Sequence, residues 1–181
     1  QGTYRGVYDY NTFTTDEAII PVRGGDWYDG GFWADLYTHN WAEDSKPLYD
    51  TWKYLYKVIV FSNDALTTID KHKQLLTDEQ YKAYRAEVRA IRALYYYYLM
   101  DMFGNIPLVT TADESTENVE QASRPEVYRF IVKELQEVTP LLPTGHSNLL
   151  GKNYGRVTRS VANFLLAKLM LNGEVYSDTD W

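Results

Sequence analysis

The strongest structural signal in this sequence is a long helix with a marked start and end, running from about Asp78 to Phe103. Thr77 and Gln80 have the spacing of a capping box, in which the threonine hydroxyl accepts a hydrogen bond from the amide at Gln80. Apolar and tyrosine side chains then recur every three or four residues, and Gly104 ends the pattern as a left-handed cap. Because a long amphipathic helix is stable mainly through packing of its apolar face, the chain is predicted to be mainly α.

Three further segments have helical periodicity, at about residues 46–70, 123–138 and 158–173. The segment at 123–138 opens with a second capping-box pattern, from Ser123 to Glu126. Six residues join the first two helices, which favours antiparallel neighbours. Two helical hairpins in succession predict tetratricopeptide-like antiparallel helix pairs, that is, an alpha-alpha superhelix. Only Trp52 and Leu55 match the opening of that repeat's consensus.

Residues 1–45 differ in character from the rest of the chain. Gly, Asp, Thr and Asn are frequent there and no helical period persists, so the sequence predicts an irregular N-terminal loop region ahead of one helical region at 46–181. Within this loop region, sixteen residues at 26–41 hold six aromatics and three aspartates: DWYDGGFWADLYTHNW. Such a density of aromatic and acidic side chains makes 26–41 the candidate ligand-binding segment.

Aromatic rings beside charged side chains suit carbohydrate recognition. An indole face packs on the C–H face of a sugar ring, and nearby charged groups exchange hydrogen bonds with its hydroxyls. We predict a site with Trp27 as the stacking platform and Asp26 and Arg23 as hydroxyl partners. The full set of predicted contact residues is Arg23, Asp26, Trp27, Tyr28 and Trp33. The alternative, which stays open, is that these aromatics anchor an irregular loop onto the helices.

Composition excludes several other functional classes. Eighteen Lys and Arg against 25 Asp and Glu give a net charge of −7, without the basic stripe of a nucleic-acid-binding domain. The absence of cysteine excludes a disulfide framework, thiol catalysis and a Cys-zinc site. The three histidines lack the HExxH spacing, and no phosphate-binding loop or nucleophile elbow is present. The sequence therefore predicts neither an enzyme nor a bound cofactor or metal.

Two clusters on the long helix have simpler explanations than a ligand site. Arg85, Arg89 and Arg92 share one face, where ion pairs with this acidic chain are favoured over an anionic ligand. The four consecutive tyrosines at 95–98 spread around most of the helix circumference. They predict a helix that packs on several sides, with each hydroxyl finding a partner or water.

Two long motifs resemble the SusD/RagB-like nutrient-binding lipoproteins. The first is AEVRAIRALYYYYL at residues 86–99, continuing to FGNIP at 103–107, and the second is YGRVTRSVANFLLAKLMLNGEVY at 154–176. The triplet TDE at 15–17 and the spacing between Tyr128 and Leu135 are also similar to that family. The resemblance covers nearly the whole chain. Since whole family members are considerably longer, we expect this chain to correspond to their N-terminal portion.

The resemblance implies a function as well as a fold. It implies non-catalytic binding of an oligosaccharide or polysaccharide on the outer face of the outer membrane. There, the family's full-length precursors are held by a lipid on an N-terminal Cys that this chain lacks, and they hand glycans to a TonB-dependent, SusC-like transporter. The family's starch-binding prototype uses a Trp and an Asn shortly after the TDE triplet. Counting from that triplet places these two at Val22 and Gly25, whose side chains can neither stack nor donate.

Two other interpretations are kept beside the glycan-binding one. In the first, this region is a protein-interaction scaffold that docks on the transporter without direct sugar contact, since interfaces favour the Tyr, Trp and Arg that are abundant here. In the second, it is a general tetratricopeptide adaptor for a peptide ligand, which the poor repeat consensus disfavours. Exposed apolar area on the helix faces would favour docking, whereas exposed rings at Trp27, Tyr28 and Trp33 would favour sugar binding.

Overall fold

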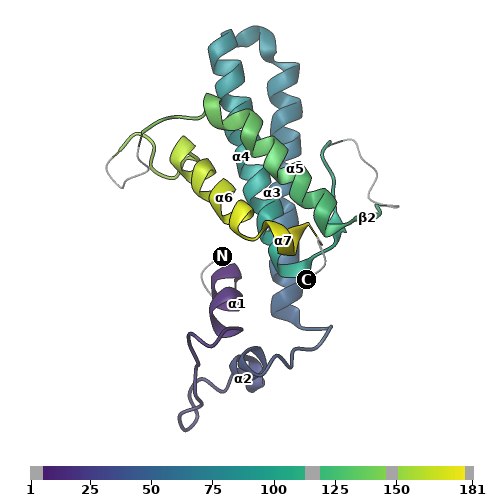
Figure 1. The fold of residues 1–181 in the computed structure, drawn as a ribbon, viewed down its shortest axis with the longest axis vertical. Coiled ribbons are helices and arrows are strands. Elements are labelled where there is room, and N and C mark those ends of the chain that lie inside the picture. Colours follow the sequence, from purple (N-terminus) through teal and green to yellow (C-terminus); the bar gives the residue numbers. More distant parts are fainter. Residues whose placement is uncertain (1–5, 113–118, 146–150, 178–181) are drawn as a thin grey trace. The chain divides into compact units, whose positions relative to one another are not determined.

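The computed structural model describes residues 6–112, 119–145 and 151–177. The chain divides into two compact units, residues 1–54 and 55–181, and the division lies within helix α3 (Lys46–Lys71). The sequence changes character somewhat earlier, near residue 45. The two units are described separately below, and Figure 1 traces both.

The N-terminal unit contains short helices where an irregular loop region was predicted. Helix α1 spans Val7–Phe13, a 3-10 turn η1 spans Asp29–Gly31, and helix α2 spans Phe32–Tyr37. Helix α1 starts where the Gly6 amide donates to the Asp9 carboxylate at 3.1 Å. Both helices have at most seven residues, which is too short for a 3.6-residue period to be recognised, and this is why the sequence pattern missed them.

The helical unit begins with the rest of α3 and helix α4 (Asp78–Phe103), joined by a 3-10 turn η2 (Lys73–Leu75). The two helices are antiparallel, because the Tyr81 hydroxyl donates to Asp70 at 2.8 Å near one end of the pair. The capping box at Thr77 is confirmed: the Gln80 amide donates to the Thr77 hydroxyl at 3.2 Å, and the Thr77 amide donates to the Gln80 side chain at 3.0 Å. Both predicted ends of α4 are correct.

The second helical pair is α5 (Arg124–Val138) and α6 (Arg159–Leu171). The 3-10 turn η4 (Thr139–Leu141) follows α5, and helix α7 (Gly173–Tyr176) follows α6. A two-residue antiparallel ladder joins β1 (Ile106–Pro107) to β2 (Gln121–Ala122). The Ser123 side chain makes no capping hydrogen bond, so the second capping box is wrong. The Arg124 amide instead donates to the Asn105 side chain at 2.8 Å, a partner distant in sequence.

Helix α4 lies at the centre of this unit and packs on α3, α5 and α7 (Figure 1). The four tyrosines at 95–98 follow the prediction of a helix packed on several sides. Tyr96 and Tyr97 are buried, while Tyr95 and Tyr98 are half-buried. The Tyr96 hydroxyl donates to the Val109 carbonyl at 2.6 Å and accepts from the Val109 amide at 2.8 Å. The buried tyrosine therefore fixes the strand-to-loop segment after α4.

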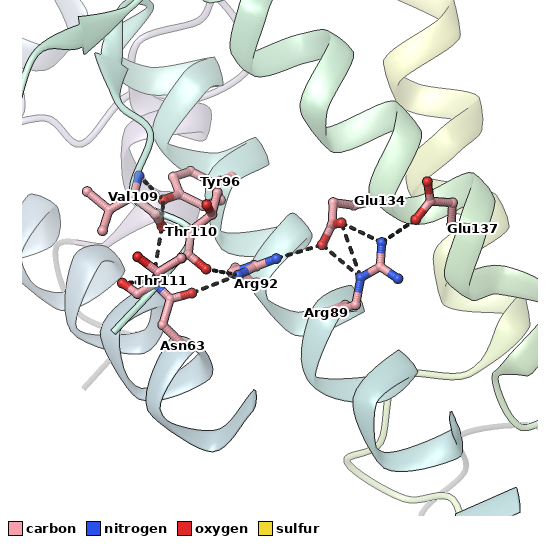
Figure 2. A network of polar contacts seen from close by, with 9 residues as sticks. All are labelled: Asn63, Arg89, Arg92, Tyr96, Val109, Thr110, Thr111, Glu134 and Glu137. Carbon is pink, nitrogen blue, oxygen red and sulfur yellow. Dashed lines mark hydrogen bonds and ion pairs between the residues drawn. The ribbon is translucent and has the colours of Figure 1, made fainter. Parts of the chain in front are cut away.

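The arginines of α4 are held in ion pairs, as predicted. Arg85 pairs with Asp70, Arg89 with Glu134 and Glu137, and Arg92 with Glu134 at 2.9 Å. Figure 2 shows that Arg92 reaches three elements, since its Nη1 also donates to the Asn63 side chain and the Thr110 carbonyl, both at 2.8 Å. This buried polar network, named here the Arg92 network, joins α3, α4, α5 and the 109–111 segment.

The charge of Glu134 is stabilised by this network. Burial alone would raise the pKa of the Glu134 carboxyl, but hydrogen bonds from Arg89 and Arg92 outweigh burial and hold that pKa below its usual value. A buried carboxylate that accepts from two guanidinium groups meets the condition under which charge is tolerated in an interior. The arginines on this face of α4 therefore hold α4 against its neighbouring helices.

Candidate functional site

The predicted site starts with a tight hairpin in the N-terminal unit. Arg23 and Asp26 exchange two backbone hydrogen bonds, at 3.0 and 3.2 Å, and Gly24 between them has a φ of 61°. The backbone then takes positive φ at two residues other than glycine, Trp27 (61°) and Asp29 (45°). Left-handed backbone costs free energy for such residues and persists only where the surroundings enforce it, often at ligand sites.

This backbone presents two neighbouring aromatic rings to solvent. Trp27 is 52% exposed and Tyr28 is 58% exposed, although both are large apolar side chains that usually lie inside. Beside them, the Arg23 guanidinium and the Asp26 carboxylate make no hydrogen bond or ion pair among the described residues. Four of the five predicted contact residues therefore lie in the hairpin or directly after it, with two unpaired charged side chains and two exposed rings.

The fifth predicted contact residue, Trp33, lies in the interior, which corrects the prediction for it. Trp33 is 3% exposed, and its ring contacts the edges of Phe13 and Phe32 with centroids 5.2 and 5.0 Å apart. Its indole Nε1 donates to the Asp29 carboxylate at 2.7 Å. Trp33 lies on helix α2 and packs against Phe13 of α1. This indole therefore stabilises the loop from the interior and does not face a ligand.

Trp33 also links the interior to the exposed ring. The Trp27 and Trp33 rings meet edge-on with centroids 6.5 Å apart and planes inclined at 61°. Edge-to-face aromatic pairs of this kind are favourable and directional. Trp33, itself fixed by its hydrogen bond to Asp29, is therefore a buried neighbour that favours one orientation of the exposed Trp27 ring.

A small hollow lies next to α2, and the sequence prediction did not single it out. It has a volume of about 200 Å³, and its lining includes Phe32, Asp35, Trp41 and Ser45. Trp41 is 48% exposed and contacts the edge of the His39 ring, with centroids 5.6 Å apart. The aromatic-rich segment contains these residues, but their convergence depends on the short helix α2, for which the sequence had no signal.

The described residues contain no cluster suited to metal binding. No group of three or more His, Asp or Glu side chains within residues 6–112, 119–145 and 151–177 could hold a metal ion. Over the same residues, no helix is both long enough and apolar enough to cross a membrane. What the hairpin can do chemically is pack a flat ring on an apolar ligand face while exchanging hydrogen bonds with its hydroxyls.

Comparison with known proteins points to one family. Residues 3–171 match the SusD-like family model described as "Starch-binding associating with outer membrane". The chain is 25% identical to the starch-binding protein SusD of Bacteroides thetaiotaomicron over 181 residues, which are 99% of this chain and 30% of that protein. It is 25% identical to a SusD-like protein of Bacteroides ovatus over 92% of this chain, again covering 30% of the relative. The chain thus spans about 30% of the length of these curated relatives.

Solved structures give the same result. Surface glycan-binding protein A from Bacteroides uniformis matches 96% of this chain and 38% of its own chain, with a TM-score of 0.80 and 25% identity. A laminarin-binding SusD-like protein matches 97% of this chain and 37% of its own, with a TM-score of 0.79 and 27% identity. Surface glycan-binding protein A from Bacteroides thetaiotaomicron, solved with laminarihexaose, matches 95% of this chain and 34% of its own, with a TM-score of 0.78 and 26% identity.

Proposed function

Because the chain belongs to the SusD-like family of outer-membrane-associated starch-binding proteins, we propose that it binds an oligosaccharide or polysaccharide through the hairpin at Arg23–Asp26 and the rings that follow it. The observation that carries this proposal is the pair of exposed neighbouring rings, Trp27 and Tyr28, beside the unpaired side chains of Arg23 and Asp26. SusD-like proteins bind glycans without cleaving them, and the proposed activity is likewise non-catalytic.

In this proposal Trp27 is the platform and its neighbours supply directionality. A sugar ring stacks on the indole face, while the Asp26 carboxylate accepts from hydroxyls and the Arg23 guanidinium donates to them. Trp33 takes a supporting part, because its hydrogen bond to Asp29 and its edge contact with Trp27 order the loop beforehand. A platform ordered in advance loses less conformational entropy on binding, which raises affinity. The relative solved with laminarihexaose supports this ligand class.

We place the protein at the outer membrane, facing outward, and held there by a lipid anchor on the full-length precursor. The family's association with the outer membrane supports this location. In the same proposal, the bound glycan passes to a TonB-dependent, SusC-like transporter. The helical unit is then the scaffold, because the fold that this chain shares with the solved relatives extends over nearly its whole length.

A second candidate function is docking on that transporter by the helical unit. The observation that favours it is a pair of exposed apolar side chains on α6, Phe164 and Leu171, which are seven residues apart and so share one face of the helix. Exposed apolar side chains gathered on one helix are typical of a protein contact. Docking through α6 and sugar binding through the hairpin use different units and are compatible in one molecule.

Isothermal titration calorimetry tests the glycan proposal. The wild-type chain is titrated with laminarihexaose and with maltohexaose, and the Trp27→Ala variant is compared with it. We expect Trp27→Ala to weaken binding by about tenfold, since loss of a stacked ring removes both buried area and an oriented contact. Tyr8→Ala is the matched control, because Tyr8 is 73% exposed in the same unit but lies on α1, outside the hairpin. Equal affinities of wild type and Trp27→Ala would remove the hairpin from the site.

A further inference from the structure

A second and larger hollow lies in the N-terminal unit, at the start of α3. Its volume is about 530 Å³, and its lining side chains come from two short stretches: Glu43, Asp44, Lys46, Tyr49, Asp50 and Lys53. The stretch from 41 to 46 also contributes Trp41, Ala42 and Ser45 to the smaller hollow beside α2. The two hollows therefore share one short stretch of chain in their linings.

The larger hollow combines a ring with several hydrogen-bonding groups. Tyr49 is 60% exposed, and the Lys53 ammonium lies over its ring, 5.1 Å from the centroid. Lys46 forms an ion pair with Asp50, one helical turn along α3. The Glu43 and Asp44 carboxylates accept no hydrogen bond and make no ion pair among the described residues, so they are free acceptors. This set repeats the chemistry of the hairpin, with an accessible ring flanked by donors and acceptors.

The charges of the hollow narrow the class of ligand. Three carboxylates (Glu43, Asp44 and Asp50) face two ammonium groups (Lys46 and Lys53). This balance offers no excess of positive charge to attract an acidic polysaccharide, and the whole chain, at −7, repels one. A neutral polyol, in contrast, can use donors and acceptors at once without requiring a net charge.

We infer that the hollow at the start of α3 is a further sugar subsite with Tyr49 as its platform, so that the N-terminal unit takes a long neutral oligosaccharide rather than a single sugar. This inference rests on the proposed function, since it extends the same bound chain beyond the hairpin. Residues 41–46 contribute to both hollows, and the smaller hollow with Trp41 is also lined by residues of α2. A chain of several sugars is the ligand that could contact such separate rings together.

Affinity measured against ligand length tests the inference. Wild type, Tyr49→Ala and the exposed-tyrosine control Tyr8→Ala are titrated with laminari-oligosaccharides and malto-oligosaccharides from the disaccharide to the hexasaccharide. We expect Tyr49→Ala to leave disaccharide affinity unchanged and to weaken hexasaccharide binding about three- to tenfold. Tyr49→Phe keeps the ring and should keep wild-type affinity. Circular dichroism of each variant ensures that the compared proteins are folded.

Each other outcome has a definite meaning. If Tyr49→Ala equals wild type for every length while Trp27→Ala loses binding, the subsite is overturned and the proposed function stands. If wild type binds none of these oligosaccharides, the proposed function fails and the inference fails with it. Binding of the hexasaccharide should also be nearly independent of salt, because no net charge attraction is involved. An acidic polysaccharide such as alginate that competes better than the neutral hexasaccharide would overturn the ligand class.

Discussion

The two units of this protein use the same kinds of side chain for opposite purposes. In the helical unit, Tyr96 is fully buried and its hydroxyl exchanges two hydrogen bonds with the backbone of Val109. In the N-terminal unit, Trp27 and Tyr28 lie on left-handed or loop backbone and are more than half exposed. Tyr96 on the central helix α4 is used for packing, whereas the strained loop holds the same kind of ring in solvent.

The arginines show the same contrast. Arg92 is buried and reaches Asn63, Thr110 and Glu134 at once (Figure 2), while the Arg23 side chain makes no hydrogen bond among the described residues. Polar groups that are satisfied internally contribute to one well-defined packing and have little left for a ligand. Polar groups left free on an ordered loop contribute little to stability and remain available. Recognition chemistry is therefore expected in the N-terminal unit.

Among tests of this contrast, removal of the central carboxylate of the Arg92 network should have the largest effect on stability. Glu134→Ala leaves the buried Arg92 and half-buried Arg89 without their shared partner, so we expect a loss of about 3–5 kcal/mol in the free energy of unfolding. Urea unfolding followed by far-UV circular dichroism measures it. The control is Asp70→Ala, which breaks the more exposed pair with Arg85 and should cost below about 1 kcal/mol. Equal losses in the two variants would contradict a special part for the buried network.

Acid provides a milder test of the same carboxylate. The pKa of Glu134 in the folded protein lies below its ordinary value because Arg89 and Arg92 donate to the charged form, although burial opposes them. A carboxyl with a lowered folded pKa stabilises the fold fully above its unfolded pKa, about 4.3, and this contribution is lost as the pH falls through the folded pKa. The stability difference between wild type and Glu134→Gln should therefore shrink as the pH falls below about 4.3. A difference that stays constant over this range would show that the charge of Glu134 is not what matters.

The helical unit was largely predictable because its signals are local. Thr77 and Gln80 cap α4 through residues only three apart, and this pattern together with Gly104 predicted both ends of that helix correctly. The same pattern at Ser123 failed, since the Arg124 amide found the Asn105 side chain across a tertiary contact that no local pattern contains. Local rules hold where the nearest partner in sequence is also the nearest partner in space.

The sequence predicted which residues make up the candidate site, but not which of them are buried. The sequence identified the aromatic and acidic segment, and four of its five selected residues lie together at the hairpin. It could not separate Trp33 from Trp27, because their burial depends on α2 and on packing against Phe13. For the same reason the hollows with Trp41 and Tyr49 were missed, since each requires the folded course of residues 41–46.

Trp33 in the N-terminal unit is buried and hydrogen-bonded, like Tyr96 in the helical unit, and its contribution to stability can be tested separately. Trp33→Phe keeps a buried ring but removes the hydrogen bond from Nε1 to Asp29, so we expect the N-terminal unit to lose about 1–3 kcal/mol. Tryptophan fluorescence during urea unfolding measures it, since four of the five tryptophans precede residue 55. Glycan affinity should also fall, because the ring at position 33 would no longer be held by Asp29 and would orient Trp27 less well. The far-UV signal of the helical unit should not shift, and a shift there would contradict the separation of the two units.

The smallest change in stability is expected for a substitution at Arg23, whose side chain, unlike that of Arg92, has no hydrogen-bond partner among the described residues. Arg23→Ala removes a side chain without a partner but keeps both backbone hydrogen bonds of the hairpin, so the free energy of unfolding should change by no more than about 0.5 kcal/mol. Loss of a charged donor to the ligand should nevertheless weaken glycan binding about tenfold. Measured together, fluorescence-monitored unfolding and calorimetry distinguish a free recognition residue from a structural one. A large loss of stability with unchanged affinity would reverse the assignment, because Arg23 would then belong with Arg92 among the residues that hold the fold.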